Sequence, residues 1–251
     1  MHDTDPTQVP FPPELAALRD HVRSAHVPIT GDGDDEGPVS KLVGRPWLPA
    51  GTEWPRCPSC ERPLQLFLQL DLADLPKGAP GGGRGLAQLF YCTNSEPLCE
   101  VNCEAYSPFA DSVVARLVDP HGPGATAPEE RAHEAFPAAV IRGWTETWDL
   151  PNREELIDIG AGDEDDELPD ETEETIHAAR RPVAGDKLGG WPYWVQGVEY
   201  PSCLECGETM QLLFQIDSNH NLPFMFGDTG CAHLTQCPHH PEVLAFGWAC
   251  C

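Results

Sequence analysis

The sequence has no long apolar run and few basic residues. No stretch approaches the roughly 20 consecutive apolar residues that a membrane-spanning helix needs. The opening segment MHDTDPTQVP has neither the basic part nor the apolar part of a secretory signal. Only 15 Lys and Arg residues stand against 41 Asp and Glu residues, which gives a formal charge of −26. We therefore expect a soluble, cytoplasmic protein that binds neither nucleic acid nor membrane and whose protein partner is basic.

The common catalytic signatures are also missing. The sequence contains no GxSxG elbow, no P-loop, no GxGxxG after a predicted strand and no HExxH. The run GGGRG at 81–85 is not followed by the Lys and Ser or Thr of a phosphate-binding loop, so we interpret it as a flexible connection. Enzyme activity has little support. A small-molecule enzyme remains the alternative, either through Asp228 with His220 and His233 or through a groove between two repeats.

One stretch of the sequence occurs twice. Residues 40–71 and 186–217 align at a constant offset of 146 with the same residue at 13 of 32 positions, where chance would give about two. Each copy contains a CxxC pair and ends in an alternating run, LQLFLQLD or MQLLFQID. This period predicts a strand with one buried face. A hydrogen-bonded network is favoured over a ligand groove for the polar residues of the other face, which are Gln65, Gln69, Asp71, Gln211, Gln215 and Asp217.

Helical patterns lie outside the repeats. The stretch PPELAALRDHVRSA at 12–25 has helical apolar spacing and predicts one N-terminal helix, and the acidic run at 162–174 predicts a solvated loop. The predicted organisation is an N-terminal helical segment 1–39 and a single domain 40–251. In that domain, repeats 40–118 and 186–251 are joined by a connecting segment 119–185. The fold class is α+β and β-rich, with a duplicated β-meander unit and an N-terminal helix.

The eleven cysteines are the main functional clue. Cytosolic thiols are kept reduced, so clustered cysteines point to a metal rather than to disulfides. In each repeat a third cysteine follows the CxxC pair, and zinc prefers four Cys or His ligands. In repeat two, His240 has the CxxH spacing, and in repeat one Cys99 and Cys103 both qualify, the shorter return favouring Cys99. The predicted ligands are Cys57, Cys60, Cys92 and Cys99 in one site and Cys203, Cys206, Cys237 and His240 in the other.

Four protein ligands would close each site. Catalytic zinc keeps one position open for water, so the closed sets predict two structural zinc ions. A thioredoxin-like redox role is disfavoured because each CxxC precedes a strand rather than a helix. Buried free cysteines are the remaining alternative.

The chain resembles the YwqG-like family, a bacterial domain of unknown function. The resemblance rests on KLVGRPWLPAGTEWP, LQLFLQLDL, GWTETWDLP, DKLGGWPYWVQG and FGDTGCAHLTQCPHHP. It implies a duplicated, β-rich fold. Members need not carry the cysteine ligands, so the zinc prediction depends on the spacing in this sequence.

A more local similarity, to programmed cell death protein 2-like proteins, rests on CxxC, LQLFLQ and LFYC. That similarity implies a role as a dedicated chaperone of a basic ribosomal protein. The resemblance to the YwqG-like family implies a second possible role, as an immunity-type partner of toxins. We therefore expect a protein-interaction module that is stabilised by zinc and whose partner is a basic protein.

Overall fold

The described strands form mainly one large antiparallel sheet. The structure is a computed structural model, and it describes residues 9–33, 36–82, 84–125, 136–160, 170–179, 181–218 and 220–251. Ten strands pair in the order β12-β11-β10-β9-β1-β8-β2-β4-β5-β6. Their bounds are β1 (Arg23–Gly31), β2 (Lys41–Leu42), β4 (Gln65–Asp71), β5 (Leu86–Tyr91), β6 (Val113–Val118), β8 (Ala139–Asp149), β9 (Lys187–Gly189), β10 (Gln211–Asp217), β11 (Cys231–Gln236) and β12 (Leu244–Ala249).

The predicted α+β class with an N-terminal α-helix is wrong. Over 12–25 the chain forms a 3-10 helix, η2 (Pro13–His21), and then enters strand β1 in the middle of the sheet. Pro28 lies within this strand. The pairing of β1 with β9 extends over Ala25 and His26 and ends before Pro28, where proline would not interrupt it.

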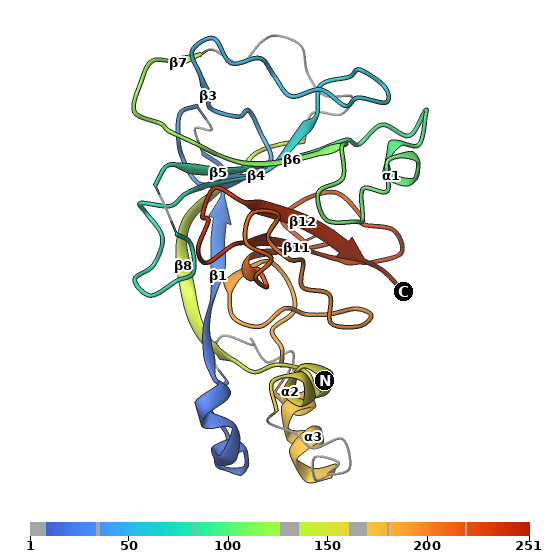
Figure 1. Cartoon of the computed structure of the whole chain (residues 1–251). Coiled ribbons are helices and arrows are strands. Elements are labelled where there is room, and N and C mark those ends of the chain that lie inside the picture. The colour runs from blue at the N-terminus through green and yellow to red at the C-terminus, as the bar shows by residue number, and fades with distance from the viewer. Residues whose placement is uncertain are drawn as a thin grey trace.

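The two predicted meanders are joined through exchanged strands. β1 precedes repeat one in the chain but pairs with β9 of repeat two, Ala25 lying opposite Gly189. β8 precedes repeat two but pairs with β2 of repeat one, Lys41 lying opposite Val140. β1 and β8 also pair with each other along most of their length, as Figure 1 shows. The strand before repeat one therefore extends the sheet of repeat two, and the strand before repeat two extends the sheet of repeat one.

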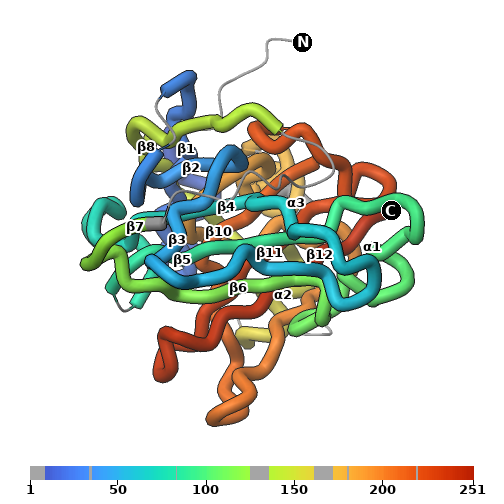
Figure 2. Tube along the Cα trace, turned by 90° about the horizontal axis from the view of Figure 1, so that it is seen from above, coloured from blue at the N-terminus to red at the C-terminus, as the bar shows by residue number. Residues whose placement is uncertain are grey.

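The sheet curls until its two edge strands, β6 and β12, come into contact. Trp248 of β12 helps to close this seam, since its backbone N–H donates to Tyr106 and its indole N–H donates to the Tyr91 hydroxyl. Seen from above, β4–β6 lie over β10–β12 (Figure 2). The main apolar core fills the space between these two layers, with Phe67 of β4 and Phe226 among its members.

Strand β4 is buried on both faces, although the alternating pattern predicts one buried face. A small second sheet of β3 (Leu48–Pro49) and β7 (Gly124–Ala125) lies above β4–β6 in Figure 1. Beneath it, Gln69 donates to the carbonyls of Gly37 and Val39 and accepts from the backbone of Trp47.

Gln215 makes the same three bonds 146 residues later, to Val183, Gly185 and Tyr193. The predicted hydrogen-bonded network is confirmed for Gln69 and Gln215, and both side chains are fully buried, so neither lines a groove.

The helices gather at the lower end of Figure 1, apart from α1 (Cys99–Asn102) at the right. Leu15 and Leu18 of η2 pack with Leu156 of α2 (Arg153–Asp158) and Ile176 of α3 (Asp170–Ala178). Among the described residues, no helix has the length and apolar character needed to cross a membrane. The predicted acidic loop lies outside the described residues from 162 to 169, and the rest of it belongs to α3.

A buried ion pair joins β8 to β9. Lys187 Nζ donates to Asp149 Oδ2 at 2.8 Å and to the Trp191 carbonyl at 2.5 Å. Asp149 also accepts from the backbone N–H groups of Trp191 and Val183. Both charged side chains are fully buried. Burial lowers the pKa of Lys187, and the neighbouring Asp149 carboxylate opposes this shift.

Candidate metal centres

Each CxxC pair lies on a tight turn just before a strand. Cys57 N–H donates to Arg62, and Glu61 N–H donates back to the Cys57 carbonyl at 2.8 Å. Cys203, Gly207 and Glu208 make the equivalent pair of bonds in repeat two. Residues 61 and 207 both have a positive φ, 58° and 75°, which allows the chain to reverse. Both turns therefore present their two thiols in the same way.

The third cysteine reaches each turn through a β-hairpin. β4 pairs antiparallel with β5, and the pairing ends with Gln65 opposite Tyr91. Cys92 therefore comes out beside the CxxC turn that precedes β4. The pairing of Gln211 with Gln236 in β10 and β11 positions Cys237 in the same manner. In each repeat, the hairpin thus brings a cysteine that is about thirty positions later in the sequence close to the CxxC pair.

The fourth residue comes from a short local element. Cys99 is the first residue of α1, and its backbone N–H donates to Asn94. His240 is held in a turn closed by Val243 N–H to the His240 carbonyl. The ligand atoms of each set lie within 4.8 Å of one another, and the sets are Cys57, Cys60, Cys92 and Cys99, and Cys203, Cys206, Cys237 and His240.

The spacing of the ligand atoms suits zinc. Two thiolates at 2.3 Å from one tetrahedral zinc ion lie about 3.8 Å apart. The Cys60 and Cys92 Sγ atoms are 3.7 Å apart, and so are those of Cys206 and Cys237. His240 Nδ1 lies 3.8 Å from the Cys237 sulfur. These distances leave room for one ion in the middle of each set.

Backbone N–H groups favour the thiolate form of one cysteine in each set. Burial opposes ionisation of Cys57, but the N–H groups of Cys60 and Ser59 and the neighbouring thiols lower its pKa below the usual value. Burial likewise opposes ionisation of Cys237, whose pKa is lowered by the N–H groups of His239 and His240. Burial raises the pKa of Cys99 to about 11. A bound cation would offset the cost of holding several thiolates together.

The two sets differ in how well they are covered. The first set packs into an apolar cluster that contains Leu48, Trp54 and Phe90, and Cys99 is completely buried. The second set packs against Met210 and Ala245, and Cys206 is exposed. Solvent and competing ligands therefore reach the second set more readily.

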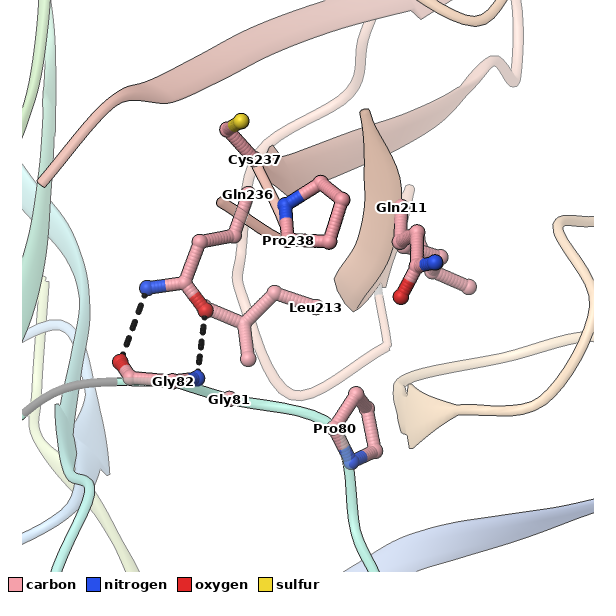
Figure 3. A pocket seen from close by; sticks show the side chains of 9 residues that line it. Pro80, Gly81, Gly82, Gln211, Leu213, Gln236, Cys237 and Pro238 are labelled. Carbon is pink, nitrogen blue, oxygen red and sulfur yellow. Dashed lines mark hydrogen bonds between the residues drawn. The ribbon is translucent and has the colours of Figure 1, made fainter. Parts of the chain in front are cut away.

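A loop from repeat one is bound to Gln236, the residue that precedes Cys237 of the second set. Gly82 exchanges two hydrogen bonds with the Gln236 side chain, its N–H donating to Oε1 at 2.8 Å and its carbonyl accepting from Nε2 at 3.1 Å (Figure 3). Pro80, Gly82, Cys237 and Pro238 help to line a pocket of about 240 Å³ there. Gln236 was not identified from the sequence, although it directly precedes a predicted ligand.

We expect zinc to leave the two centres at different rates. With an excess of a chromogenic chelator, release should show two phases of equal amplitude, the second set emptying at least about tenfold faster because Cys206 is exposed. Cys206→Ser should abolish the fast phase, and Cys60→Ser, at the equivalent position, should abolish the slow one. A single rate for both ions would contradict this prediction.

Other cysteines lie outside these sets. Cys103 is partly buried beside the first set, but it is the ligand atom of Cys99 that lies close to those of the other three cysteines. Cys231 is buried with its sulfur 3.8 Å from His233 Nε2. Cys250 is partly exposed and Cys251 is exposed.

The residues proposed for an alternative acid–base site have separate partners. Asp228 is exposed, and its Oδ1 accepts from the Thr229 hydroxyl. His220 Nδ1 lies 3.3 Å from Asp186 Oδ2. Burial lowers the pKa of His233 to about 3, so this histidine is neutral beneath Trp194. Each of these three residues contacts a different partner, so these contacts do not indicate a shared catalytic centre.

Comparison with known proteins identifies a family without an assigned function. No curated protein matches the chain at a significant level. The family model described as "Domain of unknown function (DUF1963)" matches residues 40–236. This match begins at the first predicted repeat and includes six of the eight clustered residues, all but Cys237 and His240. Since it covers well over half of the sequence, the chain belongs to the DUF1963 family.

Proposed function

We propose that this protein is a cytoplasmic protein-interaction module whose two repeats are each held together by a structural zinc ion. The observation that carries the proposal is the pair of closed four-residue sets, each with its ligand atoms within 4.8 Å. Thiolate and imidazole ligands select zinc over magnesium or calcium, and four protein ligands leave no position for a reacting water. The role of each ion is to stabilise the fold.

The proposed partner is a basic protein. The formal charge of −26 favours encounter with a positively charged surface and disfavours nucleic acid. The resemblance to the YwqG-like family and the local similarity to programmed cell death protein 2-like proteins support a chaperone or immunity-type role. Both resemblances involve the strand that follows the first CxxC turn.

Native mass spectrometry of the protein, purified gently from its own host, tests both parts. We expect two zinc ions per chain and a stoichiometric basic protein. Protein that folds without zinc would contradict the structural role of the metal. Protein that carries two zinc ions but turns over a metabolite, with no basic protein bound, would contradict the interaction role.

A further inference from the structure

The segment that completes the first cysteine set also exposes a group of apolar side chains. Four of the nine large apolar side chains that are exposed in the described residues lie between positions 98 and 109. They are Leu98 (48% exposed), Val101 (58%), Tyr106 (43%) and Phe109 (37%), and we call them the α1 patch. Such a concentration within one short segment marks an interaction surface more often than scattered apolar residues do.

The α1 patch is held rigidly. Cys99 begins α1 and belongs to the first cysteine set, so a bound zinc ion would fix the helix that begins just after Leu98 and contains Val101. Glu100 accepts from the Tyr91 hydroxyl at 2.9 Å, which ties α1 to β5. The Tyr106 ring contacts the Trp248 ring, and the Tyr106 carbonyl accepts from the Trp248 backbone N–H. A surface that is ordered before binding loses less entropy when a partner docks.

The backbone of Phe109 supports a binding role. Its φ is 63°, in the left-handed region that bulky residues avoid, at a cost of about 1 kcal/mol or more. Despite this cost the ring is not buried in the core. Backbone outliers of this kind cluster at functional sites, including the segments that clamp a ligand.

The charge around the patch indicates which partner it suits. The segment 93–112 contains Glu96, Glu100, Glu104 and Asp111 but no Lys or Arg. Glu96, Glu104 and Asp111 are exposed. Exposed apolar side chains and exposed carboxylates in one segment match a partner segment that carries both cations and apolar side chains. A second copy of this chain would bring the same carboxylates face to face, which disfavours self-association here.

On the basis of the proposed function, we infer that the α1 patch is the docking surface for the basic partner. The partner docks through a segment in which Lys or Arg residues flank Leu, Ile or Phe. The apolar side chains of that segment pack on Leu98, Val101 and Phe109, and its cations lie against the exposed carboxylates. The first zinc centre then serves binding as well as stability, because it shapes the segment that makes contact.

A random peptide array probed with the full-length, zinc-loaded protein tests this inference. We expect bound peptides to be enriched in Lys or Arg beside Leu, Ile or Phe. Leu98→Ser/Val101→Ser should weaken binding of these peptides at least about tenfold. Ile29→Ser is the matched control, because Ile29 is exposed to a similar extent on β1, and it should change binding less than about twofold.

A second variant covers the possibility that the first disturbs the neighbouring cysteine set. The charge-reversal variant Glu96→Lys/Glu104→Lys/Asp111→Lys leaves the α1 patch itself unchanged and should weaken the same peptides, most strongly at low salt. Peptide binding that survives both variants, or an array without bound peptides, overturns the inference. So does a dimer in sedimentation equilibrium that Leu98→Ser/Val101→Ser dissociates. A basic protein that still copurifies in any of these cases leaves the proposed function standing.

Discussion

Cys99→Ser is expected to reduce the zinc content from two ions per chain to one and to destabilise the protein strongly. Structural zinc contributes about 10–16 kcal/mol to the folding of small zinc-finger peptides. Here the apolar cluster around Trp54 and Phe90 supplies part of the stability of the region. We therefore expect a loss of about 3 kcal/mol or more, which for a chain of this size lowers Tm by about 6–12 °C.

Cys103→Ser provides the matched control. Cys103 follows Cys99 at the end of the same helix, and its backbone N–H donates to the Cys99 carbonyl. Its thiol is not part of the four-residue set, so the variant should keep two zinc ions and almost the full Tm. Zinc content by elemental analysis and thermal unfolding by circular dichroism measure both effects. The reverse result, with zinc lost from Cys103→Ser alone, would show that the wrong cysteine has been assigned.

Asp149→Ala is expected to cost about 3–5 kcal/mol, because it leaves the Lys187 ammonium buried without its carboxylate. Three backbone N–H groups, those of Leu150, Val183 and Trp191, also lose their acceptor. Urea unfolding measures the loss. Adding Lys187→Met should recover part of it, since a buried pair costs less to replace than to break. The control Glu36→Ala removes the acid of an exposed ion pair with Arg45 and should cost less than about 1 kcal/mol.

The cost of Asp149→Ala should also depend on pH. Burial already lowers the pKa of Lys187, and losing the neighbouring carboxylate lowers it further. Between that lowered pKa and the value of about 10.4 in the unfolded chain, the unfolded state binds more protons than the folded state. Stability in this window therefore rises with pH. The difference between wild type and variant should narrow from pH 7 to pH 9.5, and a difference that widens would contradict the buried ammonium.

The clustering of the cysteine residues could be predicted because it depends on short distances along the chain. A CxxC turn, a hairpin and a short return from Cys92 to Cys99 leave little freedom, and the structure brings together the eight residues named from their spacing. His240 was identifiable for the same reason, since two residues separate it from Cys237. Their role as zinc ligands stays a prediction.

The course of the sheet could not be predicted from local patterns. The apolar spacing up to Ala25 is typical of a helix, but pairing with β8 and β9 makes the residues from Arg23 onward a strand. Alternation in β4 indicated one buried face, yet the chain at Gly37, Val39 and Trp47 folds over the other face and binds Gln69. Contacts between distant parts of the sequence decided both outcomes.

The exchanged strands set an order of events during synthesis. β1 is made early, but its second edge stays open until β9 has left the ribosome, because Ala25 pairs with Gly189. Proteolysis of stalled nascent chains should therefore find β1 protected only after residue 189 has emerged, and earlier protection would contradict this expectation. Throughout that interval the nascent chain carries an unpaired strand edge of the kind that promotes aggregation. The nascent chain would thus depend on protection from aggregation while it is being made.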